Sequence, residues 1–130
     1  MQDRPTYDEL LAAVEHFLDT EIVPNVPGSR GFHARVAANA IRIIRRELSN
    51  EEDQLAAEWS GLDAVLGPAE RPAGRKQLRT ALLERNEALC TLIRSGDADD
   101  GEAARKVLEH VQRTVRDKLT VSDPALLERS

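Results

Sequence analysis

Apolar residues recur at helical spacing along most of the chain, and this pattern restricts the possible folds more than any other feature. The pattern is strongest in residues 31–48, which read GFHARVAANAIRIIRREL. An α-helix turns by about 100° per residue, so one half of this segment's circumference is apolar. Such a wide arc is typical of a helix covered on two sides, and we expect this helix to be central. The arc consists of Phe32, Val36, Ala37, Ala40, Ile43, Ile44 and Leu48.

Capping motifs and helix-breaking residues predict where the first helices begin and end. Residues 6–9 (TYDE) match a capping box, in which the threonine and glutamate satisfy free backbone amides. Prolines and a glycine in residues 24–28 end this first helix. A second helix is expected over 29–48. Residues 49–52 (SNEE) match another capping box, so we expect a third helix from Ser49 to the stop at Gly67.

The remaining sequence predicts two further helices. One is expected over residues 74–95 and ends at Gly96, while Asp99 or Asp100 caps the last one. No segment has the alternating pattern of a strand. We therefore expect an all-α protein, an up-and-down helical bundle of about five helices. Residues 1–130 are expected to form a single domain with short flexible ends at 1–5 and 122–130.

Composition limits the kinds of partner and the cellular location. The 130 residues carry a net charge of −5, which argues against binding to a nucleic-acid backbone. No apolar run is long enough to cross a bilayer, so no membrane association is expected. The chain has one cysteine and starts without an apolar signal sequence. These features predict a cytoplasmic protein.

His33 is a candidate functional residue because it falls within the apolar arc, in the first turn of its helix. It is expected to be neutral there, since the positive end of a helix disfavours an imidazolium. One interpretation makes it a general base or ligand in a pocket. The other makes it a histidine at the edge of the core that hydrogen-bonds a carbonyl. His16 and His110 occur singly, so neither a metal site nor a cofactor is predicted.

Glu47 and Arg85 each fall among apolar positions of their helices. Burying either charge without a partner would be costly, so we expect the two to meet as an interhelical ion pair that fixes helix register. A catalytic role for Glu47 is disfavoured, because no second carboxylate is placed beside it.

A polar stripe along residues 35–46 is the best candidate for a contact surface. Its members follow at i, i+4, i+7 and i+11, so they share one edge of the helix. Guanidinium groups bind carboxylates and phosphates, so the stripe would receive a phosphorylated ligand or an acidic partner. The alternative is pairing with acidic residues of the neighbouring helices. The stripe consists of Arg35, Asn39, Arg42 and Arg46.

Several short motifs together resemble a known bacterial family. They are residues 1–6 (MQDRPT), 32–40 (FHARVAANA), 46–48 (REL), 92–96 (LIRSG) and 123–124 (DP). This sequence is similar to the family of domains of unknown function numbered 6285. The family has no assigned activity. Its members are commonly encoded beside aminoglycoside-phosphotransferase-like proteins and acyl-CoA dehydrogenases, which implies an accessory role and no catalytic residues that can be transferred.

Three hypotheses about function follow. The first is a non-enzymatic helical accessory or regulatory protein that acts with a phosphotransferase-like or acyl-CoA-metabolising enzyme. The second is a small-molecule-binding or catalytic module with a pocket near His33, lined also by Arg35 and Asn39. The third is a homodimer in which a second copy covers exposed apolar surface.

Overall fold

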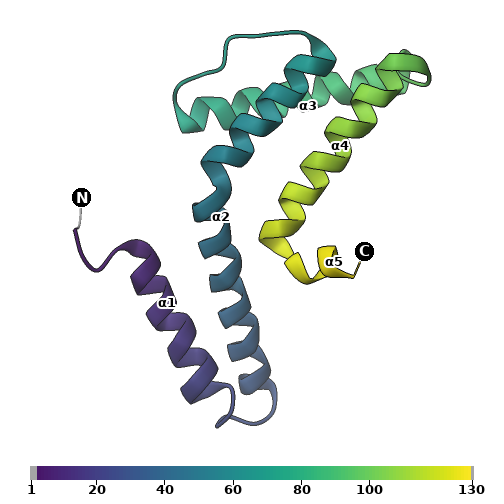
Figure 1. The fold of residues 1–130 in the computed structure, drawn as a ribbon. Helices are drawn as coiled ribbons and strands as arrows, with labels where there is room; N and C mark the ends of the chain where they lie inside the picture. Colours follow the sequence, from purple (N-terminus) through teal and green to yellow (C-terminus); the bar gives the residue numbers. More distant parts are fainter. Residues whose placement is uncertain (1–2, 130) are drawn as a thin grey trace. The chain divides into compact units, whose positions relative to one another are not determined.

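The computed structural model describes residues 3–129, and all regular structure within them is helical. The helices are α1 (Tyr7–Phe17), α2 (Ser29–Leu66), α3 (Arg75–Ser95), α4 (Gly101–Ser122) and α5 (Pro124–Glu128), shown in Figure 1. A π-helical turn, Leu18–Ile22, continues α1. The predicted all-α fold is confirmed.

The capping box predicted at Thr6 is present and fixes the start of α1. The backbone N–H of Glu9 donates to Oγ1 of Thr6 over 3.2 Å. The N–H of Thr6 donates to Oε2 of Glu9 over 2.9 Å. Two of the amides that a helix start leaves unsatisfied are thereby bonded.

Helix α2 is one uninterrupted helix, so the predicted division at Ser49 was wrong. The Ser49 hydroxyl donates to the carbonyl of Arg45, four residues earlier, over 2.9 Å. This is the bond of a serine inside a helix and not of one that caps its start. Residues 49–52 carry the letters of a capping box, but no proline or glycine precedes them to end the helix.

Other predicted ends are confirmed by backbone geometry. Gly67 follows α2 with φ of 94°, and Gly96 follows α3 with φ of 84°. Both conformations are left-handed, which only glycine adopts without strain. At the chain end, α4 continues to Ser122 and α5 follows it, within the range that was predicted to be flexible. Residues 1, 2 and 130, which belong to the predicted flexible ends, lie outside the described part.

The chain divides into two compact units, Met1–Ser49 and Asn50–Ser130. The N-terminal unit contains α1 beside the first half of α2 (Figure 1). The C-terminal unit contains the second half of α2 with α3, α4 and α5. Its core joins α2 and α3 through Trp59, Leu62, Leu82 and Leu89.

In the N-terminal unit, α2 is buried along a different edge from the one predicted. Ala38 is fully buried, whereas Phe32, Val36 and Ile44 are each about half exposed. A small alanine allows two helices to approach closely. Arginines on the same edge bind carboxylates of α1, so ion pairing and close approach together select this edge. The predicted arc therefore does not form the contact with α1.

Candidate functional site

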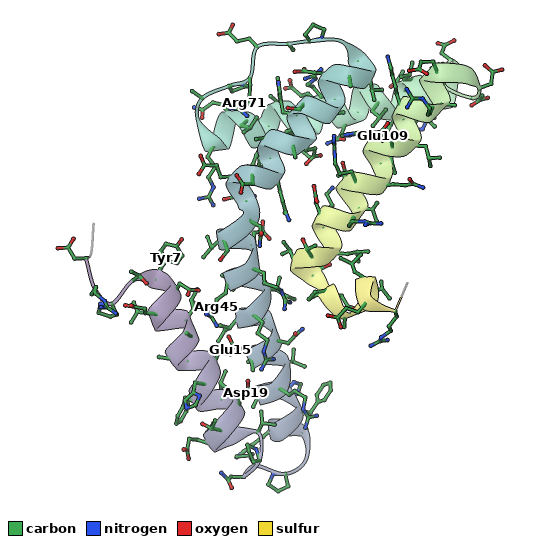
Figure 2. The ribbon with its side chains drawn as sticks, viewed as in Figure 1. Tyr7, Glu15, Asp19, Arg45, Arg71 and Glu109 are labelled. Carbon is green, nitrogen blue, oxygen red and sulfur yellow. The ribbon has the colours of Figure 1, made fainter. Side chains whose placement is uncertain are left out.

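Two arginines of α2 bind three carboxylates of α1 in the N-terminal unit. Nε of Arg45 lies 2.8 Å from Oδ1 of Asp8, and its Nη1 lies 2.8 Å from Oε2 of Glu15. Nε of Arg42 lies 2.9 Å from the other Glu15 oxygen, and its Nη2 contacts Asp19. Figure 2 labels Arg45, Glu15 and Asp19 between the two helices. This network holds α1 against α2.

The network shifts the proton affinity of its members. The hydrogen bond from Arg45 lowers the pKa of Asp8 below its usual value. The bonds to Asp8 and then Glu15 raise the pKa of Arg45, and the bond to Asp19 raises that of Arg42. These shifts favour the charged forms of Asp8, Arg42 and Arg45, which suits a structural contact. The acidic side could have been read from the sequence, because Asp8, Glu15 and Asp19 follow at i, i+7 and i+11.

The structure separates the members of the predicted polar stripe. Arg42 is engaged with α1, which is the intramolecular pairing considered as the alternative. Arg35 and Asn39 are exposed, and within residues 3–129 neither side chain is in an ion pair or hydrogen bond. Arg46 is half-buried and also interacts. Arg35 is thus the arginine of the stripe that is open to an external partner.

His33 is exposed on the surface of α2. Its ring meets the ring of Phe32 edge-on, with the centroids 5.6 Å apart. No ion pair or hydrogen bond orients the imidazole within the described residues. The ring is therefore open to solvent, and a pocket around His33 stays a prediction.

Arg85 binds Asp63 within the C-terminal unit, and its predicted pair with Glu47, which belongs to the N-terminal unit, stays a prediction. Its Nη1 lies 2.6 Å from Oδ1 of Asp63, and its Nη2 donates to the carbonyl of Gly67 over 2.6 Å. The guanidinium also lies 4.6 Å from the centre of the Trp59 ring, a cation–π contact. Glu47 is exposed, so the burial cost that motivated the predicted pair does not arise.

The Arg85 contacts fasten α3 to the end of α2 and to the loop that follows. The same Asp63 oxygen accepts from the backbone N–H of Ala69 over 3.2 Å. The Trp59 indole donates to the Ala69 carbonyl over 3.3 Å. One charged residue therefore organises a helix end, a loop and a core tryptophan. Its predicted role in fixing helix register stands as a hypothesis, now with Asp63 as the partner.

His110 of α4 is a buried polar residue that was not among the predicted site residues. It is 3% exposed, and its Nδ1 has no hydrogen-bond partner among the described residues. It packs against Gly61 of α2, where an added Cβ would collide with the imidazole. Burial lowers the pKa of His110, and the nearby positive charge of Arg113 lowers it further. Its spacing along the helix could have indicated that His110 is buried. It lies three residues after Val107 and eleven before Val121, both of which face inward.

Polar contacts join α4 and α3 to α2 around His110. Nε2 of Gln54 on α2 donates to the carbonyl of Asp117 and to the hydroxyl of Thr120, over 3.0 and 3.1 Å. Nδ2 of Asn86 on α3 donates to Oε1 of Glu58 on α2 over 2.8 Å. These bonds satisfy polar groups within the C-terminal unit, so we assign them a structural role.

The first half of α2 also carries an exposed apolar surface, which we call the α2 face. Phe32 is 58% exposed, Val36 50% and Ile44 47%. Ala40 lies between them at helical spacing, and Ile43 borders the face. Arg35 stands three residues after Phe32, so it flanks the α2 face on the helix surface. Adjoining apolar side chains of this size are typical of protein-binding surfaces.

Comparison with known proteins identifies the family. The profile of DUF6285, a domain of unknown function, matches residues 24–126. The chain belongs to this family. The matched part of this DUF6285 protein contains the α2 face and the Arg85 contacts, whereas α1 precedes it. No curated protein matches the chain, and no solved structure does.

Neither a metal site nor a membrane span is found in the part of this DUF6285 protein that the structure describes. Among residues 3–129, no three His, Cys, Asp or Glu side chains are grouped so that they could bind a metal ion. Within the same residues, every helix is too short or too polar to traverse a bilayer. The sole cysteine, Cys90, is exposed and unpaired.

Proposed function

We propose that this protein is a non-enzymatic accessory protein that acts by binding another protein through the α2 face. The exposure of Phe32, Val36 and Ile44 on one helix surface is the observation that carries the proposal. Burial of apolar side chains against a partner gains free energy, because it removes apolar surface from water. A partner that covers the α2 face gains that energy.

The charged groups near the α2 face support binding over chemistry. Asp8, Glu15 and Asp19 are each held by an arginine of α2, which fixes the geometry of the two helices. Groups committed to such pairs are poor proton donors and acceptors at neutral pH. They serve here as a frame that presents the apolar side chains of α2.

The chemistry of the α2 face also restricts the partner. Arg35 has no partner within residues 3–129 and borders the apolar side chains. A guanidinium at the rim of an interface favours a carboxylate opposite it. The partner surface should therefore be an apolar groove with an acidic residue at its edge.

We take the candidate partners from the family that the chain resembles. The resemblance to DUF6285 implies that the protein is encoded beside phosphotransferase-like proteins and acyl-CoA dehydrogenases. We propose a phosphotransferase-like or acyl-CoA-metabolising enzyme of the cytoplasm as the partner.

Co-purification with each candidate enzyme tests this function. Wild-type protein should retain one of them, and Phe32→Lys or Val36→Lys should reduce the binding at least tenfold, because each buries a charge in the apolar contact. Leu83→Lys is the matched control, since Leu83 is 68% exposed on α3, outside the α2 face. Arg35→Glu should weaken binding more modestly. Arg42→Glu is unsuitable, because it would repel Glu15 and Asp19.

The proposal fails if neither enzyme binds the wild-type protein. It also fails if the Phe32 and Val36 variants, shown to be folded by circular dichroism, bind as well as Leu83→Lys.

A further inference from the structure

A second apolar surface lies on α1 and is separate from the α2 face. Tyr7, Leu10, Val14 and Phe17 are between 49% and 62% exposed. We call these four residues the α1 stripe. Figure 2 labels Tyr7 at the start of this helix. The side of α1 that contacts α2 is a different one, defined by Asp8, Glu15 and Asp19.

The spacing of the α1 stripe fits a helix–helix seam. Its residues follow at intervals of three, four and three, which is the alternation of a and d positions in a heptad. Such positions align along one side of a helix and insert between the side chains of a facing helix. The spacing therefore indicates that the surface covering the stripe is itself a helix.

The charges around the α1 stripe favour an identical helix as the occupant. The stripe contains no Asp, Glu, Lys, Arg or His. The flanking heptad positions are Leu11, Ala13, Leu18 and Thr20, which are also uncharged. Two copies facing each other thus meet no like-charge repulsion, and the stripe offers no charge by which a foreign partner would be selected.

The exposed area agrees with a small dimer. From the exposed fractions, the four side chains present on the order of 450 Å² per copy. Two copies would together bury on the order of 900 Å², which is below the roughly 1,200 Å² at which standard specific interfaces begin. A dimer of this size is expected to be weak and to dissociate on dilution.

The geometry points to a homodimer formed by the α1 stripes of two copies of this chain. The interface is isologous and has a two-fold axis. Where one residue of the first copy contacts a second residue of the other copy, the same pair also meets with the copies exchanged. This interface is distinct from the α2 face, and it lies before the part of the chain that matches DUF6285.

Sedimentation equilibrium across about 1–100 µM protein tests the dimer, a range suited to a weak complex. Wild type should change from monomer to dimer in this range. Leu10→Lys and Val14→Lys should each raise the dissociation constant at least tenfold, because two ammonium groups would meet in an apolar seam. Leu83→Lys, a substitution of the same kind on exposed α3, should leave the dissociation constant within about twofold.

Nitration of Tyr7 provides a second measurement that needs no variant. Tyr7 is the only tyrosine of the chain, so the modified residue is unambiguous. Its rate of nitration should fall as the protein concentration rises through the dissociation constant, since the dimer covers its ring.

A wild-type protein that stays monomeric throughout this concentration range would overturn the proposal. So would a dimer that Leu10→Lys and Val14→Lys leave intact, or one in which Tyr7 reacts at a constant rate. Because these variants do not alter the α2 face, loss of the dimer with retained enzyme binding separates this inference from the proposed function.

Discussion

At the scale of single residues, the charges that burial would penalise are matched within each unit. Arg85 illustrates this, because it satisfies the carboxylate of Asp63 and the carbonyl of Gly67 and also stacks on Trp59. Sequence spacing correctly placed Arg85 among apolar positions and indicated that it needs a partner. It could not supply the partner, because Asp63 is chosen by the packing of two helices.

Removing Arg85 should leave Asp63 half-buried without its cation. We predict that Arg85→Met lowers the free energy of unfolding by about 2 kcal/mol. Asp63→Asn should cost less, and the double variant should cost clearly less than the sum of both. Urea denaturation followed by Trp59 fluorescence measures all four proteins. Arg94→Met, at an exposed arginine of α3, is the control, and strictly additive losses would contradict the pairing.

The buried imidazole of His110 should make the free energy of unfolding decrease in acid. Its pKa is lowered in the folded state, whereas the unfolded chain has the ordinary value of about 6.5. Above that value both states hold a neutral ring. As pH falls below it, the unfolded state binds the proton first, so the free energy of unfolding decreases until the folded pKa is also passed.

Denaturation at pH 7 and pH 5 measures this effect. His110→Gln should lose less stability than wild type between these pH values, because it lacks the titrating ring. His33→Gln is the control, since His33 is exposed, and it should behave as wild type. Equal pH dependence in wild type and His110→Gln would be inconsistent with a buried neutral imidazole.

At the scale of the helices, local signals predicted most ends correctly because they act over a few residues. The capping box at Thr6 and the glycines after α2 and α3 satisfy nearby backbone groups wherever the helices pack. The failure at Ser49 has a physical reason. A serine bonds equally well to an amide ahead of it or to a carbonyl four residues behind, and the second bond allows α2 to continue.

Alanine substitution distinguishes the two environments. Thr6→Ala should lower the free energy of unfolding by about 1 kcal/mol, because it removes a true cap. Ser49→Ala should leave stability unchanged or raise it by a few tenths of a kcal/mol, since alanine is the better residue inside a helix. Thermal unfolding followed by circular dichroism measures both. A loss at Ser49 as large as that at Thr6 would restore the predicted helix start.

The periodicity of the sequence could not predict which edge of α2 is buried in the N-terminal unit. Its apolar arc spans about half of the helix, and such a breadth does not specify which part a neighbour covers. Ala38 together with the carboxylates that bind Arg42 and Arg45 decides this in the N-terminal unit. Residues of the arc instead form the α2 face. The pattern that predicted a buried core therefore belongs to the candidate binding surface.

At the scale of the molecule, the two units use charge pairs and apolar contacts differently. The N-terminal unit pairs its arginines with α1 and leaves the α1 stripe and the α2 face exposed. The C-terminal unit has its own core around Trp59 and Leu62. Whether the chain unfolds as the single domain expected from its length stays a prediction. This division favours a scaffold that presents binding surfaces.

Photo-crosslinking from position 32 in cells tests this account most directly. A photoreactive phenylalanine analogue replaces Phe32 of the α2 face, and the same analogue at Leu83 serves as the control position. Mass spectrometry then identifies the crosslinked proteins. Position 32, and not position 83, should capture a phosphotransferase-like protein or an acyl-CoA-metabolising enzyme. Equal capture at both positions, or no capture of either enzyme class at position 32, would contradict it.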